Sequence, residues 1–199
     1  MSRVLFVGLL VALAAAPAFA QSAPPAGGGP PIGGPLVPGV CLLSQQAVFA
    51  NAKVGVAASE RLKALTQQVQ AGIDAKRAPI ESDAKALESE KAHLSPAEFA
   101  QRQQALTARV QALQADAQTG SRQVERTRQV VLARISREAQ PVVASAYAAH
   151  KCGLLLDRNS VLGGNMGGDL TADVVNGLDA HITTITFDLE PATPAAATR

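Results

Sequence analysis

Two cysteines are the residues of this chain whose types most clearly indicate chemistry. Cys41 lies in the apolar run Val40–Leu43, and Cys152 follows a long helical stretch that ends near His150. If that stretch folds back as a hairpin, both thiols lie at the same end of it. A disulfide between them would close a loop of about 110 residues and contribute about 4–5 kcal/mol on the chain-entropy account. The alternative is two buried free thiols.

No other set of residues has the spacing of a reactive site. The three histidines His93, His150 and His181 sit in separate segments, without a cysteine or carboxylate at metal-ligand spacing. The glycine-rich stretch 163–168 lacks the lysine and hydroxyl of a phosphate-binding P-loop. No serine–histidine–aspartate set or pair of carboxylates falls on a rigid element. We therefore expect no enzyme, no cofactor and no nucleic-acid partner.

Two long helices, joined at a tight turn, are predicted to position the cysteines. Apolar or small residues recur along the second helix in steps of three and four, with one step of seven over Thr127 and Arg128, as in a coiled coil. The seam of that second helix consists of Leu106, Val110, Leu113, Ala117, Gly120, Val124, Val131 and Ile135. The seam of the first helix consists of Leu62, Leu65, Val69, Ile73, Ile80, Leu87 and Leu94. Two such seams predict an antiparallel helical hairpin over residues 55–151.

The turn between the helices has a specific local signal. Ser95, Pro96 and Glu98 match a capping box with proline at the first helical position. The predicted tip consists of His93, Leu94, Ser95 and Pro96. Pro79 lies inside the first helix, where we expect a kink because proline removes one helical hydrogen bond.

The hairpin carries most of the positive charge. Residues 53–151 hold 15 basic and 10 acidic side chains, whereas residues 152–199 hold 2 basic and 6 acidic ones. The candidate basic face comprises Arg102, Arg109, Arg122, Arg126, Arg128, Arg134 and Arg137. It is either a solvated helix face or an attractant for acidic chains, lipopolysaccharide or an anionic membrane surface.

The segments outside the hairpin have distinct compositions. Residues 1–20 read as a cleavable signal peptide, with Arg3, an apolar run and a small-x-small cleavage site. Export places the mature chain outside the cytoplasm, in a compartment that permits disulfides. Residues 21–39 form a Pro/Gly-rich leader that we expect to be disordered. Residues 181–199 form a tail in which the β-branched stretch 182–187 could add an edge strand.

Residues 40–54 and 152–180 are expected to form a small body at the base of the hairpin. We predict buried strands at 40–43 and 154–156, a short strand at 161–162, and a helix that starts near Asp169 and runs through Leu178. The predicted class is α+β, mostly α. Aromatic residues make up 3% of the chain, which leaves little to bury in a compact core. Because a few short strands are a poor body alone, association of several chains is expected.

This order of segments resembles the Skp/OmpH family of periplasmic chaperones. The resemblance rests on Val40–Leu43 with Val48 and Phe49, on Leu154–Asp157, and on Asp169–Val175. That last stretch is similar to the family's terminal D-I-T-x-x-V signature. The similarity covers about residues 40 to 180, and the leader, the tail after Leu178 and Pro79 depart from it.

The resemblance implies a homotrimer in the periplasm. Strands of three chains would form a β body, and three hairpins would project from it as tentacles around a cavity. The family holds unfolded outer membrane β-barrel proteins in that cavity without ATP. A different hypothesis is a structural or adaptor coiled coil of the envelope that docks a partner through the hairpin tip.

Overall fold

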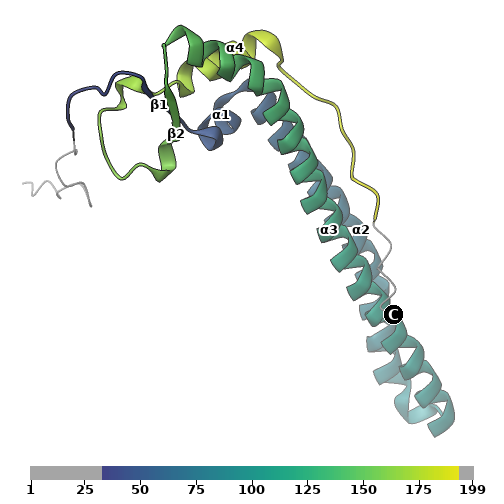
Figure 1. Cartoon of the computed structure of the whole chain (residues 1–199). Coiled ribbons are helices and arrows are strands. Elements are labelled where there is room, and N and C mark those ends of the chain that lie inside the picture. Colours follow the sequence, from purple (N-terminus) through teal and green to yellow (C-terminus); the bar gives the residue numbers. More distant parts are fainter. Residues whose placement is uncertain (1–32, 193–199) are drawn as a thin grey trace, which may run out of the picture. The chain divides into compact units, whose positions relative to one another are not determined.

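The computed structural model describes residues 33–192. The predicted signal peptide, most of the leader and residues 193–199 lie outside the described residues. The elements, in chain order, are β1 Val40–Leu43, α1 Gln45–Asn51, α2 Lys53–Glu90, η1 Lys91–His93, α3 Pro96–Ala149, β2 Leu154–Asp157, η2 Arg158–Ser160, η3 Met166–Gly168 and α4 Thr171–His181. Two long helices dominate, with two short strands at their base (Figure 1). This confirms the predicted α+β, mostly α, class.

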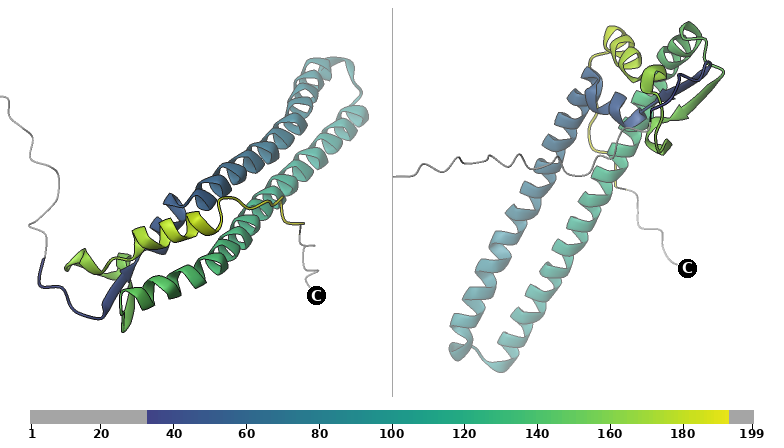
Figure 2. Two further views of the ribbon diagram at one scale, coloured as in Figure 1. Left: turned by 90° about the horizontal axis from the view of Figure 1, so that it is seen from above. Right: turned by 90° about the vertical axis from the view of Figure 1, so that its left-hand side faces the viewer.

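Helices α2 and α3 form the predicted hairpin and run side by side along their length (Figure 2). On α2, the seam residues Leu65, Ile73, Ile80 and Leu87 are all buried. On α3 the seam is closely packed near the body and looser toward the tip. Val110, which the spacing assigned to the seam, is 37% exposed, so that part of the prediction is wrong.

The seven-residue step in the α3 seam is occupied by a threonine. Thr127 is 1% exposed and lies between the buried positions Gly120 and Val131. Its hydroxyl donates to the Gln123 carbonyl of its own helix at 2.7 Å, which satisfies the buried group. The seam is therefore continuous, with one polar member.

The prolines do not interrupt either helix. Pro79 lies inside α2 and Pro141 inside α3, and each helix is continuous across its proline, so Pro79 does not divide the first helix in two. Helix α2 begins at Lys53, directly after Ala52, whose extended backbone (ψ 141°) is the whole linker to α1. Burial of Ile73 and Ile80 on both sides of Pro79 keeps the seam in register.

At the base of the hairpin, β1 and β2 pair in parallel. The register runs from Val40 opposite Leu154 to Leu43 opposite Asp157. Parallel neighbours need a long crossover, and here the crossover is the entire hairpin. On its other side β1 bridges to the chain before α4, where the Leu170 amide donates to the Leu42 carbonyl at 2.9 Å. Strand β1 thus lies between β2 on one side and the segment before α4 on the other.

Two strand predictions are wrong. Residues 161–162 form no strand, and Leu162 is fully exposed (101%). Strand β2 was expected to be buried, but Leu154 is 49% and Leu156 is 38% exposed. The reason is that nothing in the described chain covers the outer edge and face of β2.

Helix α4 closes the core of the body. Leu170, which precedes the helix, and Val174 and Leu178 within it are fully buried, together with Val54 of α2 and Val131 of α3. The core therefore joins the strand pair to the proximal end of the hairpin. No helix among the described residues is long and apolar enough to cross a membrane.

The tail after α4 is not the predicted edge strand. From Ile182 to Ala192 the chain has no strand assignment and runs along the hairpin (Figure 1). Ile185 is buried in the core cluster, at 7% exposure. The backbone of this stretch bonds to side chains of the hairpin, which replaces the pairing with another strand that the β-branched composition indicated.

An acidic side chain at the start of α4 has an altered pKa. Burial opposes ionisation of Asp169, but hydrogen bonds from Thr171 and the ion pair with Arg158 outweigh it and lower the pKa below its ordinary value. The Arg158 Nη1 to Asp169 Oδ2 distance is 2.9 Å, and the Thr171 amide donates to Oδ1 at 2.9 Å. Ionised Asp169 therefore stabilises the junction between β1 and α4.

We expect the free energy of unfolding of Asp169→Asn to fall less between pH 5 and pH 3 than that of the unmodified chain. A lowered native pKa means that the stabilisation is complete above the unfolded-state pKa of about 4 and is lost as the pH falls toward the native pKa. Urea unfolding at pH 5 and pH 3 measures this, and the unmodified chain should lose more stability between the two than Asp169→Asn. Equal losses in both proteins would contradict the assignment.

Candidate functional site

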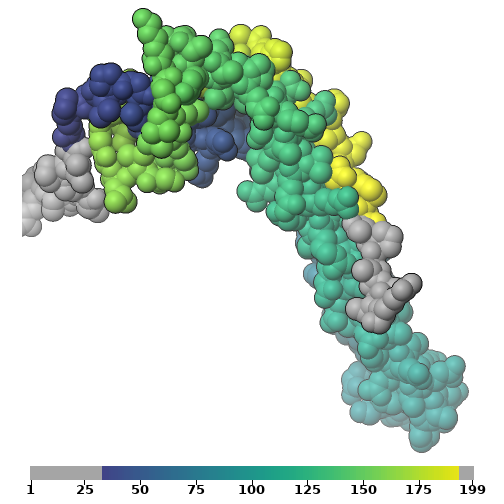
Figure 3. Space-filling model, in the orientation of Figure 1, coloured from purple at the N-terminus to yellow at the C-terminus, as the bar shows by residue number. Residues whose placement is uncertain are grey.

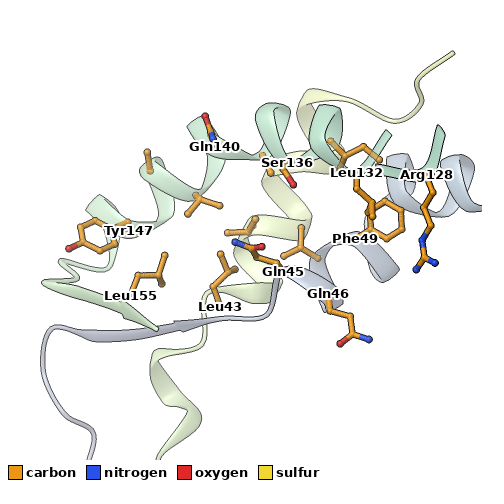
Figure 4. A pocket seen from close by; sticks show the side chains of 16 residues that line it. Leu43, Gln45, Gln46, Phe49, Arg128, Leu132, Ser136, Gln140, Tyr147 and Leu155 are labelled. Atoms are coloured by element: carbon orange, nitrogen blue, oxygen red, sulfur yellow. The ribbon is translucent and has the colours of Figure 1, made fainter. Parts of the chain in front are cut away.

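An apolar pocket lies at the base of the hairpin, within the described residues. It has a volume of about 770 Å³ and opens to solvent. Figure 4 shows side chains from α3, α1, β1 and β2 converging on it. Its lining comprises Leu43, Gln45, Gln46, Val48, Phe49, Arg128, Leu132, Ile135, Ser136, Ala139, Gln140, Val143, Ala144, Tyr147, Leu155 and Val174.

One stripe of α3 supplies more than half of this lining. The contributing positions lie between residues 128 and 147 at spacings of one, three and four, which places them on one helix face. Leu132, Val143 and Tyr147 are only half-buried there. Which face stays uncovered depends on α1 and β1, whose placement the pattern did not fix.

The chemistry available in the pocket is that of apolar contact with a polar rim. Phe49 and Leu132 line one end of it, with Arg128 beside them, and Gln45 and Gln140 lie nearer to Tyr147 (Figure 4). Such a surface can hold apolar side chains of a partner and can hydrogen-bond to the partner's backbone through glutamine side chains.

The predicted basic face divides into two parts. All seven arginines are exposed. Near the tip, Arg102 pairs with Glu90 across the hairpin at 2.6 Å, and Arg109 pairs with Asp83. Their charges are therefore balanced locally, and these pairs are exposed contacts that contribute little to stability.

Closer to the base the arginines bond to neutral groups. Arg122 donates to the Thr119 hydroxyl at 3.0 Å, Arg134 to the Thr186 carbonyl at 3.2 Å and Arg137 to the Ala133 carbonyl at 3.4 Å. Arg128 lines the pocket, and Arg126 is exposed on the same helix. Arg102 and Arg109 near the tip thus pair with carboxylates, whereas Arg122, Arg134 and Arg137 bond to neutral oxygens nearer the base.

The two cysteines are joined in the structure. Cys41 and Cys152 form a disulfide with their Cα atoms 5.8 Å apart and a separation of 111 positions in the sequence. The bond ties β1 to the end of α3. Lys151, at φ 54°, makes the left-handed turn that follows the end of this helix.

The hairpin tip is a closed polar turn. The Glu98 amide donates to the Ser95 hydroxyl at 3.3 Å, and the Ser95 amide donates to the Glu98 carboxylate at 3.0 Å. The Ser95 hydroxyl also donates to the Glu98 carboxylate at 2.6 Å, and this bond, followed by that of the Ser95 amide, lowers the pKa of Glu98. His93, Ser95 and Pro96 are exposed, while Leu94 is half-buried. The tip residues are thus together as predicted, and they present little apolar surface.

The histidines near the body pair with single carboxylates. His150 lies 2.7 Å from Asp173, and His181 lies 3.5 Å from Glu138, each pair linking α3 to α4. In the described part of the chain, no three histidine, cysteine or acidic side chains lie close enough to hold a metal ion.

Comparison with known proteins places the chain in a family. A family model described as outer membrane protein (OmpH-like) matches residues 39–178. A crystal structure of an OmpH-like protein from Caulobacter crescentus, assigned as a candidate outer membrane chaperone, is similar with a TM-score of 0.73. The two share 36% sequence identity over 83% of this chain and 97% of the other. No curated protein matches the sequence. The span of the family match shows that this chain belongs to the Skp/OmpH family of chaperones.

Proposed function

We propose that this chain is an ATP-independent holdase of the periplasm that binds unfolded outer membrane β-barrel proteins. The observation that carries the proposal is the open apolar pocket at the base of the hairpin. A pocket with an apolar floor and an amide-bearing rim suits many loose contacts with an unfolded chain. Unfolded barrel strands alternate apolar and polar residues and carry aromatic side chains, which supply what such a pocket binds.

We further propose that the working form is a homotrimer. The support is the outer edge of β2, where Leu154 and Leu156 are exposed and no second strand of residues 33–192 pairs with the backbone. A two-stranded sheet is marginal alone, and an exposed apolar edge strand favours pairing with another chain. Copies that associate through β2 would bring their hairpin bases, and with them their pockets, around one space.

The basic side chains beside the pocket support a role in the initial electrostatic attraction of a client or a lipid surface. Arg128 and its neighbours on α3 would attract acidic segments of a client or an anionic lipid surface over about 10 Å at moderate salt. The tip-docking alternative has less support, because the tip satisfies its own polar groups and Leu94 is half-buried.

Suppression of aggregation tests the proposal. A urea-denatured outer membrane barrel protein is diluted into buffer, and light scattering follows its aggregation with and without the mature chain. We expect suppression at a few-fold molar excess without ATP. Leu132→Gln, which puts an amide into the pocket, should weaken client binding about fivefold, since it removes part of the apolar contact of one leucine.

Val110→Gln is the matched control. Val110 is an apolar residue of the same helix that is 37% exposed and lies outside the pocket lining. This variant should suppress aggregation as well as the unmodified chain. Solution mass is recorded for all three proteins, so that a change of assembly is seen separately. No suppression by the unmodified chain would contradict the proposal, and a monomeric mass would contradict the trimer.

A further inference from the structure

The segment Ile182–Ala192, here called the strap, lies against the helix pair and outside the family match, which ends at residue 178. Figure 3 shows its yellow atoms against the green surface of α3. The strap follows α4 and runs back along the proximal part of the hairpin (Figure 1). It contacts side chains of both α2 and α3.

Side chains of the hairpin hold the strap by its backbone. The Arg61 Nε donates to the Phe187 carbonyl at 3.3 Å, and the Arg134 Nη1 donates to the Thr186 carbonyl at 3.2 Å. At the far end, Glu190 is bound on both sides. Its amide donates to the Thr127 hydroxyl at 2.8 Å, and its carbonyl accepts from the Gln123 side chain at 3.0 Å. These four bonds recognise an extended chain irrespective of its sequence.

Thr127 is the most informative member of this set. Thr127 occupies a seam position, where a coiled coil normally has an apolar residue that packs against the partner helix. Instead a hydroxyl at 1% exposure accepts the strap's amide. The two hydrogen bonds of the Thr127 hydroxyl offset the free-energy cost of burying it. The seam therefore has a polar residue, in place of apolar packing, at the position where it binds the strap backbone.

The side chains of the strap alternate between two environments. Ile185 is buried, Phe187 and Leu189 are half-buried, and Thr186 and Asp188 between them are exposed. One ion pair, from Arg61 to Asp188 at 2.5 Å, adds to the contacts at the outer face. A period of two, with apolar residues on one side only, is also the pattern of a transmembrane β-barrel strand.

We propose that Arg61, Gln123, Thr127 and Arg134 line a groove for an extended segment of alternating apolar and polar residues, and that the strap is its resident occupant. An unfolded barrel strand has the same pattern and competes for the same groove. The inference rests on the proposed function for the identity of the competitor. Because the strap is tethered, its effective concentration is in the millimolar range, so that only a client that also binds elsewhere displaces it.

Peptide binding to the full chain tests the groove. The probe is a fluorescent peptide with the sequence of residues 182–192, followed by anisotropy. Ile185→Ser combined with Phe187→Ser should release the strap, and we expect this variant to bind the peptide at least tenfold more tightly than the unmodified chain. Adding Thr127→Val to that variant removes the acceptor for the Glu190 amide and should reverse most of the gain.

Thr184→Asn is the matched control, because Thr184 is an exposed residue of the same strap. It should bind the peptide as weakly as the unmodified chain. A probe peptide with the same composition but without alternation should bind poorly to the released variant. Equal binding of the peptide by released and unmodified chains, or equal binding of the two peptides, would overturn the proposal. Far-ultraviolet circular dichroism establishes that each variant keeps its helices.

Hydrogen exchange of the unmodified chain gives a second test that needs no variant. The Glu190 amide should be protected in the free protein and should exchange about tenfold faster when an unfolded barrel protein is bound. Unchanged exchange in the bound state would overturn displacement of the strap. Failure of the holdase proposal is distinguishable, because it would appear as unsuppressed light scattering even if the released variant binds the peptide.

Discussion

Replacing Cys41 and Cys152 with serine lowers the free energy of unfolding by about 4–5 kcal/mol, the value expected for a loop of this length on the chain-entropy account. The bond closes 111 residues of sequence and ties β1 to the end of α3. Without it, the unfolded chain gains freedom, and the parallel strand pair must form across the whole hairpin unaided. We expect the strand pair and α4 to loosen first, while the distal coiled coil keeps its helices.

Urea unfolding at one fixed protein concentration measures the loss, since association would make stability depend on concentration. Reductant should destabilise the unmodified chain by the same amount as the double substitution and should leave the serine variant unchanged. That variant is therefore the control for reductant. Two reactive thiols in denatured, unreduced protein would show that the bond is absent and would remove the basis of this prediction.

Gly55→Ala destabilises the chain by about 3 kcal/mol or more, because a methyl group has no room at this position. A Cβ atom there would lie 1.8 Å from the Phe49 carbonyl oxygen and 2.8 Å from its carbon. Both atoms belong to backbone, so neither can rotate away. The close approach arises because Ala52 alone links α1 to α2, which folds α1 back against the first turns of the long helix. Relief requires α1 to move, and with it Val48 and Phe49 at the pocket.

Gly72→Ala is the matched control in the same helix. Apart from the chain neighbours of Gly72 and the adjacent backbone of its own helix, no atom of the described residues lies within 4 Å of a Cβ built on Gly72. Alanine is the better helix former by about 1 kcal/mol. Thermal unfolding should therefore show a lower midpoint for Gly55→Ala and an equal or higher one for Gly72→Ala. A Gly55→Ala chain as stable as the unmodified protein would mean that α1 does not pack as described.

The hairpin could be predicted from short-range sequence patterns. The seven-residue spacing of Ile73, Ile80 and Leu87 fixes one face of α2, and all three are buried. The capping box at Ser95 marks the start of α3 to the residue, because its two hydrogen bonds depend only on four consecutive residues. Both features need no knowledge of the rest of the chain, which is why they were predictable.

Features that depend on which surfaces meet were not predictable in this way. The stretch from Ile182 to Phe187 has strong β propensity, yet propensity says only that an extended backbone is favoured. Its bonding partners are Arg61 and Arg134, which are more than 50 residues away along the chain. The pocket likewise depends on where α1 leaves α3 uncovered, and the exposure of β2 depends on which elements pack over it.

The covalent ring closed by the Cys41–Cys152 bond has a consequence for the resistance of the hairpin to proteolysis. Every peptide bond from residue 41 to residue 152 lies inside that ring. A protease that cuts the exposed turn at Ser95 therefore yields a nicked molecule whose halves stay attached, rather than two separate fragments. Since each half retains its side of the long apolar seam, α2 and α3 can stay paired after the cut.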